Sequence, residues 1–274
     1  MANDRVASFD SGTWPASAPC ATFPRMDVRR QIVAFGGGGF SMEAGNPLLD
    51  DYVLSLAGVS RPRVCFLGTA SGDADDYVVR FYREFAGARA EASHLSLFKR
   101  RRGVGDVRRH LLEQDLIYVG GGSLVSLLGV WRAHGIDAIL REAWEAGIVL
   151  CGLSAGALCW FSHALTAYYG APDVVGALAM LPWSFTAHYD SEPARREEFH
   201  RLLDRGLPSG YAADDGAALH FVGRGLHGVV SSRPDKAGYA LRRGPHGVIE
   251  DRLEADYLGE ADPSRGLSLA PVAA

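Results

Sequence analysis

The stretch VLCGLSAGALC (residues 149–159) places one serine, Ser154, between two glycines at the end of an apolar run. The apolar run predicts a buried strand, and the small residues after it predict a tight turn into a helix. G-x-S-x-G between a strand and a helix is typical of a nucleophile elbow, in which the next backbone amide, here that of Ala155, faces the oxygen of an acyl intermediate. The alternative is a tight helix start in which Ser154 only caps backbone amides.

Apolar runs of strand length recur through the first half of the chain, at residues 31–35, 63–68, 92–98, 115–120 and 147–152. Helix-like segments lie between them, at residues 47–57, 75–87, 107–113, 123–128 and 136–146. Strands that alternate with helices predict an α/β fold, a doubly wound and mostly parallel sheet with helices on both faces. In such sheets ligands bind beyond the carboxyl ends of the strands.

The sequence pattern changes after about residue 205. Short segments rich in β-branched residues begin there, separated by glycines. They predict antiparallel C-terminal β-hairpins that cover one edge of the sheet. Residues 1–26 are rich in Ser, Ala and Pro, and we expect a loosely attached N-terminal extension there. Residues 27–274 are expected to form one α/β domain.

The composition excludes several classes of protein. The chain has 274 residues, 47% of them hydrophobic, and a net charge of −4 with both signs interspersed, so no nucleic-acid surface is predicted. The basic run at residues 98–110 is interpreted as a solvated loop and helix face. No secretory leader and no stretch long enough to cross a bilayer is recognised, and the four cysteines form no C-x-x-C pair. We therefore expect a cytoplasmic protein with no membrane partner, disulfide or structural zinc.

Three glycine-rich turns follow predicted strands and should open onto the same rim, at residues 35–40 (FGGGGF), 119–124 (VGGGSL) and 151–157 (CGLSAGA). A dinucleotide site is one interpretation of the first turn. Met42 stands where G-x-G-x-x-G needs its last glycine, and no acidic residue ends the second strand. No nucleotide cofactor is predicted.

A serine hydroxyl needs a base to become a good nucleophile. His188, in FTAHYDS (residues 185–191), follows an apolar segment and precedes a charged helix start, which places it in a rim loop. His163 is harder to dismiss than the other histidines. Asp214 and Asp215 are both candidates for the acid that orients the imidazole, because they stand at the turn before a predicted hairpin.

Residues 30–250 resemble peptidase E, the aspartyl dipeptidase family with the class I glutamine amidotransferase-like fold, a relative of the cyanophycinases. The motifs that carry the resemblance are VGGGSLVSLL, CGLSAGA, AHYDS, ARREEFHRLL and ADDG, in the order of the family. The resemblance implies a serine peptidase without a metal or other cofactor. It assigns the nucleophile to Ser154, the base to His188 and the acid to Asp215, at a position where family members often have glutamate.

The resemblance also implies the residues around the reacting carbonyl. The backbone amides of Ala155 and of Gly121 or Gly122 would form the oxyanion hole. Ser123 stands where the family commonly has asparagine, and we place it with Arg195 in the substrate-binding set. Arg195 would face a substrate carboxylate, which predicts short peptides with Asp at the first position.

Other interpretations remain open. An α/β-hydrolase esterase would use Ser154 with Asp214 or Asp215 and His227 or His246, whereas a glutamine amidotransferase would need a thiol at the elbow. A binding protein without catalysis is a third alternative. A short peptide is the expected partner, and a homo-oligomer is compatible with the sequence.

Overall fold

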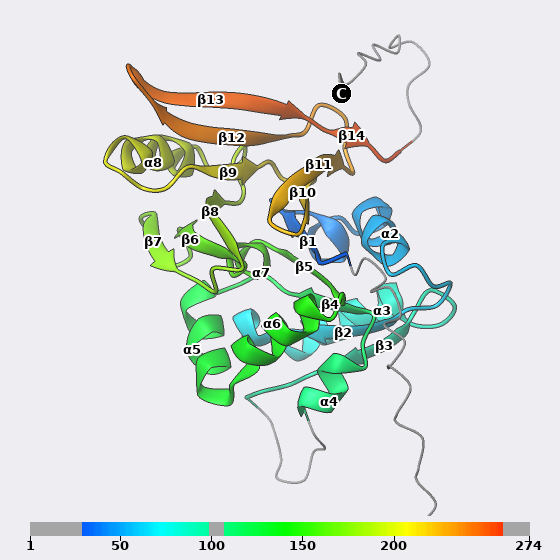
Figure 1. Ribbon diagram of the computed structural model, residues 1–274. Helices are drawn as coiled ribbons and strands as arrows, with labels where there is room; N and C mark the ends of the chain where they lie inside the picture. The colour runs from blue at the N-terminus through cyan, green and yellow to red at the C-terminus, as the bar shows by residue number, and fades with distance from the viewer. Residues whose placement is uncertain (1–28, 99–106, 260–274) are drawn as a thin grey trace, which may run out of the picture.

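The computed structural model describes residues 29–98 and 107–259, and the predicted extension at residues 1–26 lies outside them. The larger of its two sheets has eight strands in the order β14-β11-β10-β1-β5-β4-β2-β3 (Figure 1). Its strands are β1 (Gln31–Phe35), β2 (Arg63–Leu67), β3 (Glu91–His94), β4 (Leu116–Val119), β5 (Val149–Leu153), β10 (Ala217–Val222), β11 (Gly225–Ser231) and β14 (Asp256–Tyr257). The five N-terminal strands run parallel to one another, and β10 pairs antiparallel with β1.

Both faces of this sheet are covered, because successive strand residues enter opposite cores. Val33 and Phe35 pack with the helices on one side, whereas Ile32 and Ala34 pack with those on the other. The helices on the first side are α1 (Gly39–Met42), α2 (Leu48–Ser55) and α3 (Asp75–Phe85). Those on the second side are α4 (Val107–Leu112), α5 (Leu124–His134), α6 (Ile136–Glu145) and α7 (Ala155–Leu158), with the 3-10 helix η1 (Thr69–Ser71). The predicted doubly wound α/β class is confirmed.

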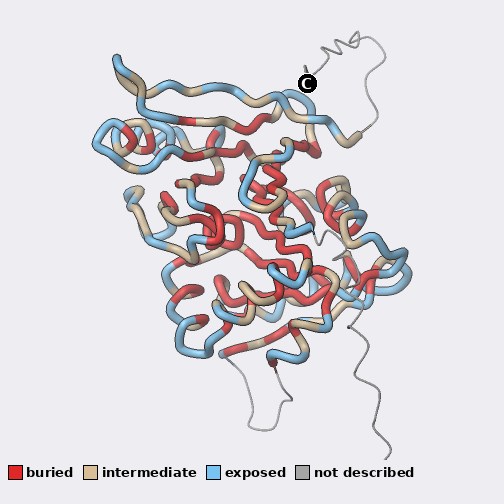
Figure 2. The backbone as a smooth tube through the Cα atoms, in the orientation of Figure 1, coloured by how far each residue is buried: buried red, intermediate tan, exposed pale blue. Residues whose placement is uncertain are grey.

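A second, six-stranded sheet has the order β13-β12-β9-β8-β6-β7. Its strands are β6 (Phe161–Thr166), β7 (Asp173–Gly176), β8 (Leu181–Thr186), β9 (Gly210–Ala213), β12 (Ala237–Gly244) and β13 (Gly247–Glu254). The helix α8 (Pro193–Asp204) packs on it through Phe199 and Leu203. Phe161 stacks on Phe185 at 4.4 Å and meets Phe221 of β10 at 5.6 Å, so the two sheets share one core. Figure 2 shows the buried segments running continuously through this junction.

The predicted C-terminal hairpins do not all cover one edge. The β10–β11 hairpin extends the first sheet beside β1, whereas the β12–β13 hairpin belongs to the second sheet. The second sheet itself was not predicted, because three of its strands lie in residues 161–186, where only an apolar segment was recognised. In the described part of the chain, no helix is long and apolar enough to cross a membrane.

Two predicted elements have different bounds in the structure. The strand expected at residues 92–98 stops at His94, and the amides of Leu97 and Phe98 donate to the carboxylate of Asp73 at 2.6 and 2.9 Å. The helix expected at residues 123–128 continues to His134 and ends at Gly135, whose φ of 68° suits a residue without a Cβ.

Candidate active site

Ser154 follows the carboxyl end of β5 and precedes α7 in a backbone conformation that serine rarely adopts, with φ 51° and ψ −120°. Its glycine neighbours allow the turn to pack closely. A Cβ at Gly152 would lie 2.4 Å from the carbonyl oxygen of Gly156, and one at Gly156 would lie 2.2 Å from that of Val119. The side chain makes no capping hydrogen bond to α7. The geometry is therefore that of a strained elbow and not of a capping serine.

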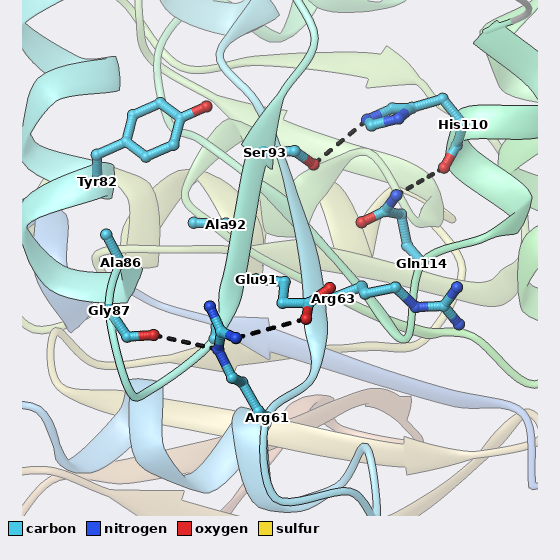
Figure 3. Close-up of a pocket in the computed structure, with 11 residues that line it drawn as sticks. Arg61, Arg63, Tyr82, Ala86, Gly87, Glu91, Ala92, Ser93, His110 and Gln114 are labelled. Carbon is cyan, nitrogen blue, oxygen red and sulfur yellow. Dashed lines mark hydrogen bonds and ion pairs between the residues drawn. The ribbon is translucent and has the colours of Figure 1, made fainter.

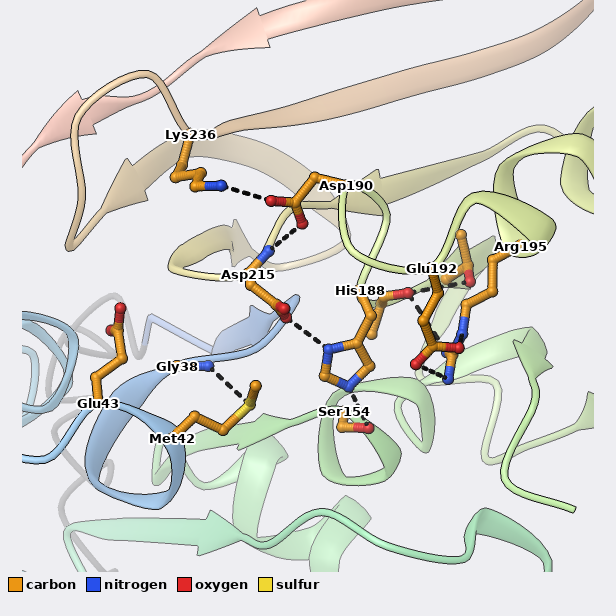
Figure 4. Close-up of polar contacts among 12 residues, drawn as sticks. Gly38, Met42, Glu43, Ser154, His188, Asp190, Glu192, Arg195, Asp215 and Lys236 are labelled. Carbon is orange, nitrogen blue, oxygen red and sulfur yellow. Dashed lines mark hydrogen bonds and ion pairs between the residues drawn. The ribbon is translucent and has the colours of Figure 1, made fainter. Parts of the chain in front are cut away.

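The side chain of His188 contacts this serine from the second sheet. His188 lies two residues after Thr186, the last residue of β8. Its Nε2 lies 3.0 Å from Ser154 Oγ, and its Nδ1 lies 2.5 Å from Asp215 Oδ1 (Figure 4). The backbone of His188 is also left-handed, with φ 57°, and its amide donates to the carbonyl oxygen of Gly36 at 3.1 Å. The loop is thus fixed at the point where the imidazole bridges a hydroxyl and a carboxylate.

Asp214 and Asp215, which the sequence left open as alternatives, point to different partners. Asp214 accepts from the amide of Ala237 at 3.1 Å and the hydroxyl of Tyr239 at 3.2 Å, and burial raises its pKa. Burial opposes ionisation of Asp215 as well, but the hydrogen bond from His188 and the other donors around it outweigh that effect and lower its pKa. Asp215 is therefore the carboxylate held in its charged form beside the imidazole.

Asp190 supports this carboxylate from behind. Its Oδ1 accepts from the backbone amide of Asp215 at 2.8 Å, and its Oδ2 accepts from Lys236 at 2.5 Å (Figure 4). Asp190 stands only two positions after His188, and its carboxylate fixes the backbone of Asp215, so its role in the site is indirect.

The first glycine-rich turn makes room for the same pair. Gly37 forms an isolated parallel bridge with Asp215, and a Cβ at Gly37 would lie 2.0 Å from Asp215 Oδ1 and 3.1 Å from His188 Nδ1. The turn FGGGGF was weighed only as a nucleotide site. Its actual constraint is the close approach of backbone to the imidazole and carboxylate.

The expected oxyanion donors lie around the serine. Ala155 begins α7 directly after Ser154, and a Cβ at Gly121 would lie 3.4 Å from the Cβ of Ser154. The amide of Gly121 already donates to the hydroxyl of Tyr77 at 3.2 Å. Gly122 has a φ of 136°, which only glycine adopts readily, and it lines the same pocket as Ser154. The amide of Gly121 is thus already bonded, whereas Gly122 lines the pocket with Ser154.

Ser123, expected in the substrate-binding set, has a different set of contacts. Its Oγ caps α5 by accepting from the amide of Ser126 at 3.1 Å, and it lies 2.7 Å from the hydroxyl of Tyr169. Only 3% of the residue is exposed. The Ser123 hydroxyl therefore bonds to the start of α5 and to Tyr169, and the short side chain stays within these contacts.

Arg195, the second expected substrate-binding residue, lines the pocket but is not free. Its Nε and Nη2 donate to the two carboxylate oxygens of Glu192 at 2.6 and 3.1 Å, and its Nη1 donates to the carbonyl oxygen of Ala187 at 3.3 Å. The side chain of Arg195 is 6% exposed and that of Glu192 is 42% exposed. Glu198, the next acidic residue but one on this helix, pairs with Arg201 and not with Arg195.

These residues surround a pocket of about 290 Å³, lined by Ser41, Met42, Gly121, Gly122, Leu153, Ser154, Thr166, Ala167, Tyr168, His188, Glu192 and Arg195. A larger cavity of about 480 Å³ lies by Arg63 and Glu91, the first residues of β2 and β3 (Figure 3). Its arginines, Arg61 and Arg63, pair with Glu91 and Asp115. The smaller pocket is the one at the carboxyl ends of the strands, where α/β sheets bind ligands.

The residues of the rival interpretations are not assembled at the serine. The ring of His227 lies 5.1 Å from that of His220, and His246 stands in the turn between β12 and β13. Cys151 is fully buried within β5, and burial raises the pKa of its thiol well above the ordinary value, so it does not supply an amidotransferase thiolate. Among the described residues, no cluster of three or more His, Cys, Asp or Glu side chains could hold a metal ion.

The sequence did not predict a role at the site for four further residues: Gly37, Asp190, Glu192 and Tyr168. Gly37 and Asp190 act through backbone contacts between segments far apart in the chain, for which a sequence carries no local signal. Glu192 stands three positions before Arg195, a spacing typical of an ion pair at a helix start. The exposed double tyrosine at positions 168 and 169, beside a glycine, was a further signal that could have been found.

An elbow serine, a histidine in contact with it and a carboxylate behind the histidine define a serine-type hydrolase. Residues 32–229 match the sequence profile of peptidase family S51. The chain is 47% identical over 231 residues to the uncharacterized peptidase YgaJ of Bacillus subtilis (strain 168), covering 84% of this chain and 100% of that protein. The chain therefore belongs to peptidase family S51 and is a serine-type peptidase.

Solved structures share the fold. A peptidase from an acI-B1 Actinobacterium superposes with a TM-score of 0.58 at 20% identity, over 82% of this chain and 94% of that one. A putative peptidase E protein from Listeria monocytogenes EGD-e gives a TM-score of 0.52 at 18% identity, over 82% of this chain and 100% of that one. The predicted resemblance to peptidase E is confirmed.

Proposed function

We propose that this peptidase hydrolyses short peptides through an acyl-enzyme on Ser154, with His188 as the base and Asp215 as the orienting acid. The observation that carries the proposal is the hydrogen-bond chain from Asp215 Oδ1 through both ring nitrogens of His188 to Ser154 Oγ. An imidazole whose Nδ1–H donates to Asp215 leaves Nε2 free to accept the serine proton. The orientation of the two bonds supports this tautomer.

The chemistry follows from that geometry. Ser154 Oγ forms a bond to the peptide carbonyl carbon while Nε2 of His188 takes the hydroxyl proton. When the tetrahedral intermediate collapses, the C–N bond breaks and the amine leaves with that proton. A water then attacks the ester, giving one proton to Nε2, and the serine regains a proton as the acid departs.

The negative oxygen of each intermediate needs donors aimed at it. We infer that the amides of Ala155, which directly follows the serine, and of Gly122, which lines the pocket, supply them. A donor of this kind contributes about 3–4 kcal/mol in other hydrolases. Asp215, with its lowered pKa, remains a carboxylate and stabilises the imidazolium that forms beside it.

The size of the pocket supports a short substrate. Its volume of about 290 Å³ is at the small end of the roughly 300–1,000 Å³ typical of ligand pockets. We infer a preference for dipeptides and other short peptides over folded proteins.

We also propose a preference for Asp at the first position, read by Arg195. The arginine lines the pocket, but Glu192 occupies its Nε and Nη2. The carboxylate of a substrate Asp can therefore pair with Arg195 only if it displaces Glu192. This competition limits the preference for Asp over other first residues. A panel of Asp-Leu, Asn-Leu and Ala-Leu with wild type and Ser154→Ala tests the function. Hydrolysis by wild type alone supports the proposal, and equal hydrolysis by Ser154→Ala contradicts it.

A further inference from the structure

The glycine-rich turn after β4, at residues 120–123, has one backbone amide without an acceptor among the described residues, that of Gly122. Gly122 lines the active-site pocket together with Ser154. Backbone N–H groups are almost always paired, so this donor is open to water or to a ligand. The other three amides of the turn have acceptors in the protein: Gly120 donates to the carbonyl oxygen of Leu67 at 3.0 Å, Gly121 to the hydroxyl of Tyr77 at 3.2 Å and Ser123 to the carbonyl oxygen of Ala70 at 2.8 Å.

Tyr77, in the first turns of α3, is the only side chain among these three acceptors. Its ring is 5% exposed and packs against Phe66 and Phe40, with centroids 5.0 and 5.5 Å apart. A Cβ at Gly120 would lie 2.9 Å from Cε1 of this ring, so the ring lies directly against the turn. The hydroxyl that bonds to Gly121 is therefore held on a rigidly packed side chain.

The Tyr77 hydroxyl also joins the turn to α1. Burial raises the pKa of Tyr77, and hydrogen bonds with Ser41 and with the Gly121 amide offset part of this rise. Ser41 and Gly121 both line the active-site pocket, whereas Tyr77 is not one of the lining residues. The hydroxyl thus lies behind two walls of the pocket and contacts both of them.

A turn of consecutive glycines needs such a support. Glycine has no Cβ and adopts many backbone conformations, and the φ of Gly122 is 136°. The bond from the Gly121 amide to Tyr77 fixes one peptide plane, and the next plane carries the Gly122 N–H. Without the acceptor, the Gly121 amide has no partner and both peptide planes are free to turn. Stabilisation of an oxyanion depends on donors that are fixed before the reaction begins.

We propose that Tyr77 is a positioning residue for the oxyanion donor: its hydroxyl takes up the Gly121 amide and thereby aims the Gly122 amide at the negative oxygen of the intermediate on Ser154. The inference rests on the proposed serine peptidase function and extends the machinery of that site to a side chain of α3. A donor aimed at the tetrahedral intermediate stabilises the transition state more than the bound substrate. Tyr77 therefore acts on kcat more than on KM.

The test uses two tyrosines of the same helix. Tyr77→Phe keeps the packed ring and removes only the hydroxyl. Tyr82→Phe is the matched control, because the hydroxyl of Tyr82 lies 2.9 Å from His94 Nδ1 and its ring lines the larger cavity (Figure 3). With Ala-Leu as the substrate, we expect Tyr77→Phe to lower kcat by about 10- to 100-fold, since a displaced donor costs less than one that is removed. Its KM should change by less than about twofold, and Tyr82→Phe should keep both constants.

A second readout follows the oxyanion itself. The boronic acid analogue of alanine inhibits by accepting Ser154 Oγ at its boron atom while the serine proton passes to His188. An oxygen on the tetrahedral boron then occupies the place of the oxyanion. The inhibition constant should rise in Tyr77→Phe by about the factor by which kcat falls, because both depend on the same donor. In Tyr82→Phe it should stay at the wild-type value.

The outcomes separate the two proposals. If Tyr77→Phe keeps the wild-type kcat and inhibition constant, or raises KM alone, the positioning role is wrong and the serine chemistry stands. Equal losses of kcat in Tyr77→Phe and Tyr82→Phe would also overturn it, since they would report a general effect on α3. If wild type hydrolyses no dipeptide and Ser154 takes no fluorophosphonate label, the proposed function is wrong and the positioning role falls with it. Melting curves establish that each variant is folded.

Discussion

Nε2 of His188 lies 3.0 Å from Oγ of Ser154, although the two residues are 34 positions apart and follow strands of different sheets. Ser154 follows β5 of the first sheet, His188 follows β8 of the second, and Asp215 lies between β9 and β10, where the chain passes from one sheet to the other. The site therefore exists only where the two sheets meet. Its geometry depends on the shared core beneath them.

Replacing Ser154 or His188 with alanine should reduce turnover of a dipeptide by several orders of magnitude, because the nucleophile or its base is lost. Neither side chain belongs to a core cluster, so the free energy of unfolding should change by no more than about 1 kcal/mol. Steady-state rates and urea unfolding measure both effects. A variant with near wild-type turnover would remove that residue from the mechanism.

Asp215→Asn should lower kcat strongly without abolishing it, because the imidazole remains present but is no longer held in the required tautomer. Asp214→Asn is the matched control from the adjacent position. Asp214 contacts Ala237 and Tyr239 and not the imidazole, so this change should affect stability more than kcat. The reverse pattern, with Asp214 needed for turnover and Asp215 dispensable, would overturn the assignment of the acid.

Gly37→Ala should disrupt the active site although it adds only one methyl group. The new Cβ would lie 2.0 Å from Asp215 Oδ1, so the carboxylate or the turn has to move. We expect a loss of kcat of at least about 100-fold, since small displacements of catalytic groups have effects of this size. Gly129→Ala, in α5 with open space around it, should leave kcat unchanged and stabilise the helix by about 0.5–1 kcal/mol. Equal activity of the two variants would show that the close approach is not required.

Glu192→Gln should raise the ratio of Asp-Leu to Ala-Leu hydrolysis. The uncharged amide keeps one oxygen acceptor but loses the charge, so it competes less strongly for Arg195, whose planar guanidinium can then pair with the aspartyl carboxylate. A gain of about tenfold corresponds to roughly 1.4 kcal/mol. Arg195→Ala should show little preference for Asp, because the cation that pairs with the carboxylate is lost. An Asp preference that survives in Arg195→Ala, or a ratio that falls in Glu192→Gln, would exclude Arg195 as the reader of the acidic side chain.

The buried Asp50 of α2 should make stability depend on pH. Burial raises its pKa from 3.8 to about 7, and the nearby Tyr118 hydroxyl offsets this only in part. Between these values the folded protein binds a proton that the unfolded chain has lost, so this group lowers the free energy of unfolding as pH rises from about 4 to 7. Asp50→Asn should remove that decline. Urea unfolding at pH 5 and 8 tests it, and an equal pH dependence in variant and wild type would contradict the assignment.

The sequence contains strong signals for the first sheet and weak ones for the second. The strands β1, β2, β4 and β5 are buried on both faces and read as continuous apolar runs, which is why they could be predicted. Strands such as β6 and β8 alternate with polar residues or contain Pro182, so they do not form continuous apolar runs. Without that signal, the sheet they build was missed.

The site shows the same division. Ser154 and His188 stand in loops directly after apolar segments, and such positions could be recognised. The choice between Asp214 and Asp215 could not be made from the residues alone, because neighbouring side chains face opposite ways and the sequence does not say which faces the imidazole. The contact of Ser123 with Tyr169 joins positions far apart in the chain and has no local signal. The pairing of Arg195 with Glu192 is local, because the two residues are three positions apart at the start of α8.

Covalent labelling of Ser154 tests the central claim most directly. Wild type, Ser154→Ala and His188→Ala are treated with a fluorophosphonate, and the adduct is located by peptide mass spectrometry. We predict a single adduct on Ser154 in wild type, none in Ser154→Ala and much slower labelling in His188→Ala, because the probe requires a serine activated by its base. An active enzyme whose Ser154 remains unlabelled, or a label on another residue that persists in Ser154→Ala, would contradict the account.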